Sequence, residues 1–143
     1  MEVKFYENIS DELFKFAVII SKHKGKWVFC KHKERDTYEV PGGHREQDEN
    51  ILDTAKRELN EETGAIDFSI EPVCVYSVTG KNRVNKTGEE TYGMLYFADI
   101  HSFDTTLKSE MELVKFFDEL PTEWTYPLIQ PLLIKEYLRR KNK

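Results

Sequence analysis

The apolar residues of the chain gather in short segments separated by polar turns, a pattern typical of β-strands. Residues 14–21 (FKFAVIIS) and 26–33 (KWVFCKHK) flank the polar turn KHKGK and therefore predict a hairpin. Two further strands are predicted at residues 73–78 and 92–99, with the polar stretch TGKNRVNKTGEE as a long loop between them. A last short strand is expected at residues 113–117.

One segment between these strands carries the start and stop signals of a helix. Asn50 is a favourable N-cap residue. Asp53, three positions later, resembles the acidic partner of a capping box, although glutamate or glutamine is usual there. The helix should continue to about Thr63, because Gly64 can adopt the left-handed conformation that ends a helix.

The C-terminal segment predicts a second helix, in which Pro131 is tolerated only in the first turn. Its apolar residues at helical spacing are Ile129, Leu132, Leu133, Ile134, Tyr137 and Leu138. Upstream of the first helix, a tight turn is expected at Gly42 and Gly43. The elements together predict an α+β protein with a helix on each side of a mixed sheet.

Length and composition favour a single domain spanning residues 1–143, since 39% of the 143 residues are hydrophobic. No segment approaches the roughly 20 apolar residues that cross a bilayer, and the N-terminal segment lacks the apolar block of a secretion signal. We therefore expect a cytoplasmic protein without membrane contact. Cys30 and Cys74 lie in predicted strands without a CxxC partner, so both should be reduced, buried thiols.

The net charge of −5 argues against a basic surface for DNA or RNA and favours a small charged ligand or a metal ion as partner. The basic residues 139–143 are interpreted as the solvated end of the last helix. Seven acidic and three basic residues lie between Gly43 and Ala65, so nearly all of the negative excess sits in one short segment.

Three of these acidic residues, Glu58, Glu61 and Glu62, share one face of the predicted helix. Like charges at this spacing destabilise a helix, so a bound cation should lie between them. Carboxylate oxygens suit Mg²⁺ or Mn²⁺. The alternative is a merely solvated acidic face. The neighbouring apolar stripe, which should pack on the sheet, consists of Leu52, Ala55 and Leu59.

The segment GHREQDENILDTAKRELNEETGA, residues 43–65, resembles the signature of the Nudix family. That signature is Gly, five residues, Glu, seven residues, Arg-Glu, an aliphatic residue, any residue, Glu-Glu, any residue, Gly and an aliphatic residue. The matching positions are Gly43, Glu49, Arg57, Glu58, Leu59, Glu61, Glu62, Gly64 and Ala65. Only Ala65 departs, because it is smaller than the usual residue. The resemblance implies the Nudix fold, an α/β/α sandwich that contains the signature helix.

The resemblance also implies roles for these residues. The main-chain carbonyl of Gly43 and the carboxylates of Glu58, Glu61 and Glu62 would bind the metal. Glu49 would pair with Arg57 and fix the loop relative to the helix. Gly42 and Gly43 would permit a backbone conformation closed to other residues and let the carbonyl approach the metal.

Two further roles stay open. The general base is either Glu58 or a downstream acid, for which Glu110 occupies the expected place and Glu112 is its neighbour. Phosphate oxygens could be contacted by basic side chains before and after the glycines, each of which could equally be plain surface. These basic candidates are His44, Arg35, Lys31 and Lys33.

The implied reaction is attack by water on a phosphorus atom of a nucleoside diphosphate linked to another group. The secondary signatures of the hydrolases of ADP-ribose, dinucleoside polyphosphates, NADH and coenzyme A are absent, which leaves a resemblance to small MutT-like enzymes that act on canonical or oxidised nucleoside triphosphates. The alternatives are an enzyme that trims the 5′ triphosphate of RNA and a non-catalytic nucleotide sensor. A monomer and a homodimer are both compatible with the sequence. Aromatic residues that could stack on a base, or belong to the core, are Trp27, Trp124, Tyr76 and Tyr126.

Overall fold

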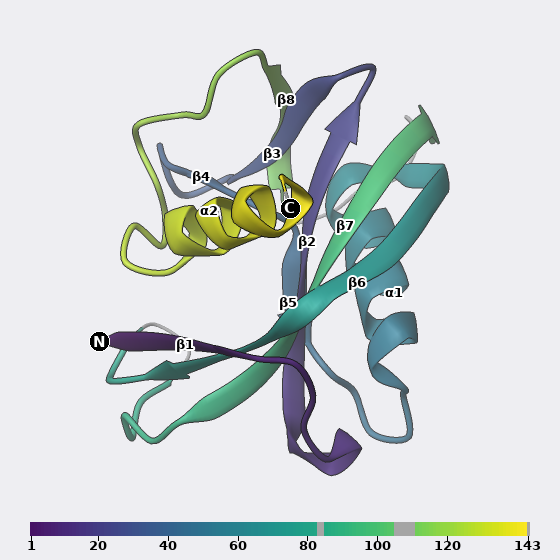
Figure 1. The fold of residues 1–143 in the computed structure, drawn as a ribbon. Coiled ribbons are helices and arrows are strands. Elements are labelled where there is room, and N and C mark those ends of the chain that lie inside the picture. Colours follow the sequence, from purple (N-terminus) through teal and green to yellow (C-terminus); the bar gives the residue numbers. More distant parts are fainter. Residues whose placement is uncertain (83–84, 105–110, 143) are drawn as a thin grey trace.

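The computed structural model of the chain describes residues 1–82, 85–104 and 111–142, and for residues 111–113 it describes the backbone alone. Over these residues an eight-stranded mixed sheet lies between two helices (Figure 1). Its strands are β1 (Glu2–Tyr6), β2 (Phe14–His23), β3 (Lys26–His32), β4 (Tyr38–Glu39), β5 (Gly42–His44), β6 (Ala65–Thr79), β7 (Thr91–Phe103) and β8 (Met111–Phe117). The main path runs β1-β6-β7-β2-β3-β4, while β5 pairs with β2 and β8 with β3.

The centre of the sheet is the parallel pair β2 and β7, and the other pairings are antiparallel. The predicted hairpin is confirmed, because β2 and β3 pair across a turn in which Lys24 and Gly25 both have positive φ. Strand β6 begins eight residues before the predicted start at residue 73, since its exposed first half lacks a strong apolar signal. For the same reason β1, an edge strand without a fully buried residue, was not predicted.

Helix α1 (Ile51–Thr63) follows its predicted limits. The side chain of Asn50 accepts a hydrogen bond of 2.9 Å from the backbone N–H of Asp53, which confirms the N-cap, and its amide group donates one of 2.9 Å to the Asp53 carboxylate. This second bond joins two side chains, whereas in a capping box the carboxylate would accept from the backbone N–H of the N-cap residue. At the other end Gly64 has a φ of 81°. A 3-10 turn (Asp11–Leu13) precedes β2.

The predicted buried stripe of α1 is partly wrong. Ala55 and Leu59 are fully buried, but Leu52 is 37% exposed and Ile51 takes its place against the sheet. Ile51, Ala55 and Leu59 are spaced by four residues and therefore share the helix face that meets the sheet, whereas Leu52 lies beside that face.

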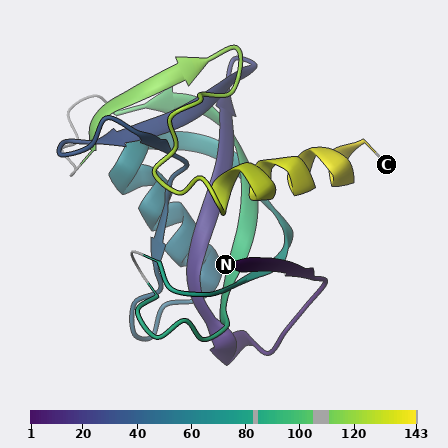
Figure 2. The same cartoon turned by 90° about the vertical axis from the view of Figure 1, so that its left-hand side faces the viewer.

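Helix α2 (Gln130–Lys141) covers the opposite face of the sheet, with Pro131 in its first turn as predicted (Figures 1 and 2). Its basic last turn lies beside acidic partners, since Arg139 and Arg140 both pair with Glu136. None of the described helices combines the length and apolar character needed to cross a bilayer.

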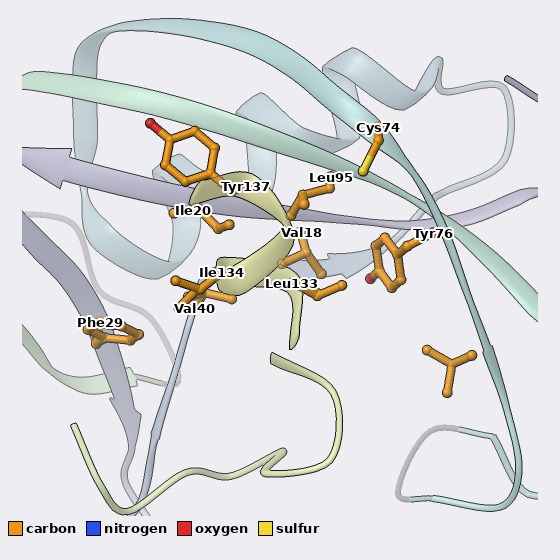
Figure 3. Close-up of a cluster of buried hydrophobic side chains, with 11 residues drawn as sticks. Val18, Ile20, Phe29, Val40, Cys74, Tyr76, Leu95, Leu133, Ile134 and Tyr137 are labelled. Carbon is orange, nitrogen blue, oxygen red and sulfur yellow. The ribbon is translucent and has the colours of Figure 1, made fainter. Parts of the chain in front are cut away.

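Each face of the sheet has its own hydrophobic core. The α1 core includes Ala17, Ile19, Ala55, Leu59 and Ile100. The α2 core includes Val18, Ile20, Phe29, Leu133 and Ile134 (Figure 3). Strand β2 serves both cores, because successive side chains point to opposite faces. Cys30 and Cys74 are buried free thiols, as expected.

Candidate functional site

The two glycines that precede the acidic helix form part of a strand and not the predicted tight turn. Gly42 pairs with Val18 and Gly43 with Ala17 in β5, and neither glycine has a positive φ. The prediction that both supply a special backbone conformation is therefore wrong. What they supply is room, because a Cβ on Gly43 would lie 2.3 Å from the carboxyl carbon of Glu58. A Cβ on Gly42 would lie 2.6 Å from the carbonyl oxygen of Ala17.

The acidic residues of α1 face these glycines to different degrees. The N–H of Gly42 donates a 2.7 Å hydrogen bond to Oε1 of Glu62, and the Glu58 carboxylate lies against Gly43. Burial raises the pKa of Glu58, although Arg57 opposes this, and raises the pKa of Glu62 well above its usual range. Glu61 lies further out, with 53% of its side chain exposed.

Arg57 connects the helix to the loop before it. Its guanidinium donates two hydrogen bonds to the carboxylate of Glu49, at 2.7 and 3.0 Å, so the predicted ion pair is confirmed. It also donates to the carbonyl of His44 at 3.0 Å and to Glu58 at 2.7 Å. Bidentate contacts of this kind are strong and directional. One side chain thus fixes the loop, the strand that carries Gly43 and an acidic residue of the helix.

The Glu49–Arg57 pair predicts a dependence of stability on pH. The hydrogen bonds from Arg57 lower the pKa of Glu49 to about 2 in the folded protein, whereas a free glutamate titrates near about 4.3. The pair therefore contributes stability above about pH 4.3 and loses it as the pH falls towards 2. We expect Glu49→Gln to lower the free energy of unfolding in urea at pH 7, and the difference from wild type to shrink at pH 3. A difference that stays constant between these pH values would contradict this assignment.

The donors on α1 fit a divalent cation. Glu58 and Glu62 are two partly or largely buried carboxylates in direct contact, and their charged forms need a positive partner. Because Gly43 has no Cβ, the carboxylate of Glu58 can lie directly against the main chain of β5. Within residues 1–82, 85–104 and 111–142, no three His, Cys, Asp or Glu side chains already converge on one metal position. In this arrangement Arg57 and the N–H of Gly42 hold the carboxylates.

A cavity of about 250 Å³ lies on the α2 side of the same strand. Gly42, Gly43 and His44 form one wall, so the cavity and the carboxylates of α1 meet at β5. The remaining walls are mostly apolar and come from β2, β6 and the N-terminal end of α2. Aromatic side chains in these walls are Phe16, Tyr76 and Tyr126.

The other candidate residues are dispersed. His44 is exposed and lines the cavity, with its ring edge-on to Phe16. Arg35 lies 3.4 Å from Glu39, a buried acid of the cavity wall. Lys31 in β3 and the exposed Lys33 are not part of the cavity lining.

Two of the four aromatic candidates line the cavity, namely Tyr76 and Tyr126. Trp124 packs edge-on against Phe29 in the α2 core, and Trp27 carries the ammonium group of Lys22 over its ring. Glu110 and the side chain of Glu112, the alternatives to Glu58 as general base, lie outside the described residues.

Gln130 is a cavity residue that the sequence analysis missed. It is buried at the start of α2, and its Oε1 accepts a 2.9 Å hydrogen bond from the backbone N–H of Val40. Its signal in the sequence was weak, because a polar residue before Pro131 is ordinary at a helix start. The signal in the sequence was a polar side chain at the start of an otherwise apolar helix face.

Comparison with known proteins agrees with this geometry. The NUDIX domain family matches residues 14–127, which include the hairpin, the glycines and the acidic helix. The chain belongs to the Nudix family. The Nudix fold and the signature resemblance are thereby confirmed.

A relative in Bacillus subtilis carries the name of a diphosphatase. Over 90 residues the chain is 37% identical to the Bacillus subtilis (strain 168) protein named "Putative 8-oxo-dGTP diphosphatase YtkD", a match that covers 63% of this chain. The match spans about half the length of that relative, 52%. This name agrees with the predicted class of Nudix hydrolases acting on phosphorus-containing anhydrides.

Solved structures show the same fold. A crystal structure of a mutant of the Bacillus subtilis pyrophosphohydrolase BsRppH superposes with a TM-score of 0.76 and 26% identity, covering 96% of this chain and 90% of the other. A NUDIX hydrolase from Nitrosomonas europaea, 22% identical, has a TM-score of 0.70 and covers 87% of each chain.

Proposed function

We propose that this Nudix protein is a metal-dependent pyrophosphohydrolase that cleaves a canonical or oxidised nucleoside or deoxynucleoside triphosphate to the monophosphate and pyrophosphate. The observation that carries the proposal is the position of β5, which has an apolar cavity on one side and the carboxylates of α1 on the other. A nucleoside in the cavity would place its phosphates beside these carboxylates.

In this proposal the carbonyl of Gly43 and the carboxylates of Glu58, Glu61 and Glu62 hold Mg²⁺ or Mn²⁺. Such an ion, when bound, supplies positive charge to phosphate oxygens and lowers the pKa of a bound water. Arg57 and Glu49 position Glu58 and the carbonyl of His44 through the contacts above.

A group that removes a proton from water must also be available, and Glu58 and Glu110 are both candidates for it. Burial raises the pKa of Glu58, which brings a carboxylate closer to the range in which it works as a base. Of the basic candidates, His44 lines the cavity, and in this proposal its imidazole contacts the phosphates. The other basic candidates do not line the cavity, namely Arg35, Lys31 and Lys33.

The cavity suits a single base and sugar in size and character. Nucleotide sites are commonly concave, mostly apolar and equipped with a few polar groups. Gln130 supplies one, because the backbone N–H of Val40 holds its Oε1 and the amide hydrogens can bond to a ligand. The name of the Bacillus subtilis relative, "Putative 8-oxo-dGTP diphosphatase YtkD", favours a purine triphosphate as substrate.

The decisive experiment measures pyrophosphate and phosphate release from a panel of substrates. The panel contains canonical and 8-oxo nucleoside triphosphates, sugar nucleotides, dinucleoside polyphosphates and RNA with a 5′ triphosphate, each with Mg²⁺, with Mn²⁺ and with a chelator. We expect metal-dependent pyrophosphate release from nucleoside triphosphates and loss of activity with the chelator. Cleavage of RNA alone would replace the nucleotide substrate with the RNA alternative, and binding without hydrolysis across the panel would favour a sensor.

We also propose that the protein is a monomer or homodimer in the cytoplasm. It acts on a small nucleotide and does not bind DNA. The negative net charge of −5 supports the small substrate, because nucleic-acid binding depends on a concentration of basic side chains.

A further inference from the structure

The hydroxyl group of Tyr76 is placed in the cavity without a hydrogen-bond partner in the described part of the chain. Tyr76 is 2% exposed and its ring forms part of the cavity wall. Figure 3 shows the hydroxyl directed towards Leu133, which belongs to α2 and also lines the cavity. The other hydroxyl on this stretch of β6, that of Ser77, bonds to Glu90 at 2.6 Å. A phenol aimed into a largely apolar cavity indicates a ligand that completes its hydrogen bonding.

The position of Tyr76 is built into the sheet. Its ring contacts that of Phe16, with the centroids 5.5 Å apart and the planes inclined by 46°. Both rings lie against Gly93 of β7. A Cβ on this glycine would lie 2.3 Å from the ring of Phe16 and 2.9 Å from Cζ of Tyr76. The absence of a side chain at Gly93 therefore lets the two rings lie against the strand. Tightly packed rings of this kind hold the hydroxyl in one place.

Burial raises the pKa of Tyr76 well above its usual range, so the group is a neutral phenol throughout the pH range of an assay. A neutral phenol both donates and accepts a hydrogen bond. Gln130 adds amide hydrogens to the cavity wall, and the bond from the backbone N–H of Val40 to its oxygen fixes the orientation of the amide group. A ligand edge that meets both groups can offer an acceptor to the amide hydrogens of Gln130 and either a donor or an acceptor to Tyr76.

We propose that Tyr76 is a specificity-determining residue whose hydroxyl hydrogen-bonds N7 of a purine base while the amide of Gln130 donates to the group at position 6, so that 6-oxopurines are favoured over 6-aminopurines. Guanine presents the O6 acceptor beside N7, whereas adenine presents an amino donor at the same place. In 8-oxoguanine N7 carries a proton, which the phenol oxygen can accept. The inference rests on the proposed nucleotide substrate and names the residue that reads its base.

The test is Tyr76→Phe, which removes one oxygen atom and keeps the ring. Binding of dGMP and dAMP, the expected product class, is measured by calorimetry on the full chain in the absence of metal. We expect dGMP to bind about tenfold more weakly to the variant, as for the loss of one buried hydrogen bond, with binding of dAMP unchanged. In turnover of dGTP, KM should rise by about the same factor while kcat stays constant, since the contact is remote from the phosphates.

Tyr96→Phe is the matched control. Tyr96 is also buried, but it belongs to the α1 core and not to the cavity wall, so the same chemical change there should leave dGMP binding unaltered. Equal dGMP binding by Tyr76→Phe and wild type overturns the inference, and so does an equal loss of dGMP and dAMP binding. If wild type binds neither monophosphate, the cavity is not the base site and the inference is wrong. The hydrolysis panel judges the proposed function separately.

Discussion

Replacing Glu61 by glutamine is expected to lower pyrophosphate release from the best triphosphate substrate by about a hundredfold or more while the protein remains folded. The carboxylate is one of the proposed metal-binding groups, and a neutral amide binds a divalent cation much more weakly. Loss of one electrostatic contact to a reacting group commonly costs this much. Steady-state kinetics at saturating and limiting Mg²⁺ measure the effect, and we expect more Mg²⁺ to be needed for half-maximal activity.

The structure separates this effect from one on stability. More than half of the Glu61 side chain is exposed, and its one ion pair among the described residues is a 3.3 Å contact with Arg57. Exposed pairs four residues apart on a helix contribute only about 0.3–0.5 kcal/mol. The melting temperature of Glu61→Gln should therefore be close to that of wild type. Glu71→Gln, an equivalent change at an exposed position in β6, is the control for charge and should keep full activity. Activity near wild type in Glu61→Gln would remove Glu61 from the proposed metal site.

The parts of the fold that the sequence predicted well are those with local signals. The limits of α1 follow from Asn50, Asp53 and Gly64, whose contacts lie within one or two turns of the chain. The hairpin of β2 and β3 follows from an apolar stretch on each side of a polar turn. Such features depend on neighbouring residues, so a pattern of a few positions is enough.

The parts that were missed depend on contacts between distant segments. The first half of β6 is exposed and is a strand because it pairs with the end of β7, from Ala65 opposite Phe103 onwards. The role of Gly43 depends on Glu58, which is near it only after α1 packs beside β5. Gln130 lies next to Val40 although 90 positions separate them. No local pattern encodes these approaches, so the acidic residues of the site could be predicted and most of the cavity could not.

Substitution of Gly43 by alanine should reduce hydrolysis by about a hundredfold, through Glu58 and not through the backbone. Gly43 has no positive φ, so alanine can adopt its conformation without strain. The new methyl group, however, would lie 2.3 Å from the carboxyl carbon of Glu58 and must displace it. Misplacement of a catalytic group by about one ångström is enough for an effect of this size.

A double-mutant cycle distinguishes this cause from a general disturbance of β5. If alanine at position 43 acts by displacing Glu58, then Gly43→Ala should add little to the defect of Glu58→Gln, because the displaced carboxylate is already gone. The measurement is kcat/KM for wild type, both single variants and the double variant, with unfolding curves to show that all four are folded. If the losses of kcat/KM in the two single variants multiply in the double variant, the methyl group harms the site in another way, such as by closing the approach to the carbonyl of Gly43. If kcat/KM of the double variant is close to that of Glu58→Gln alone, Gly43 matters for the space that it leaves to Glu58.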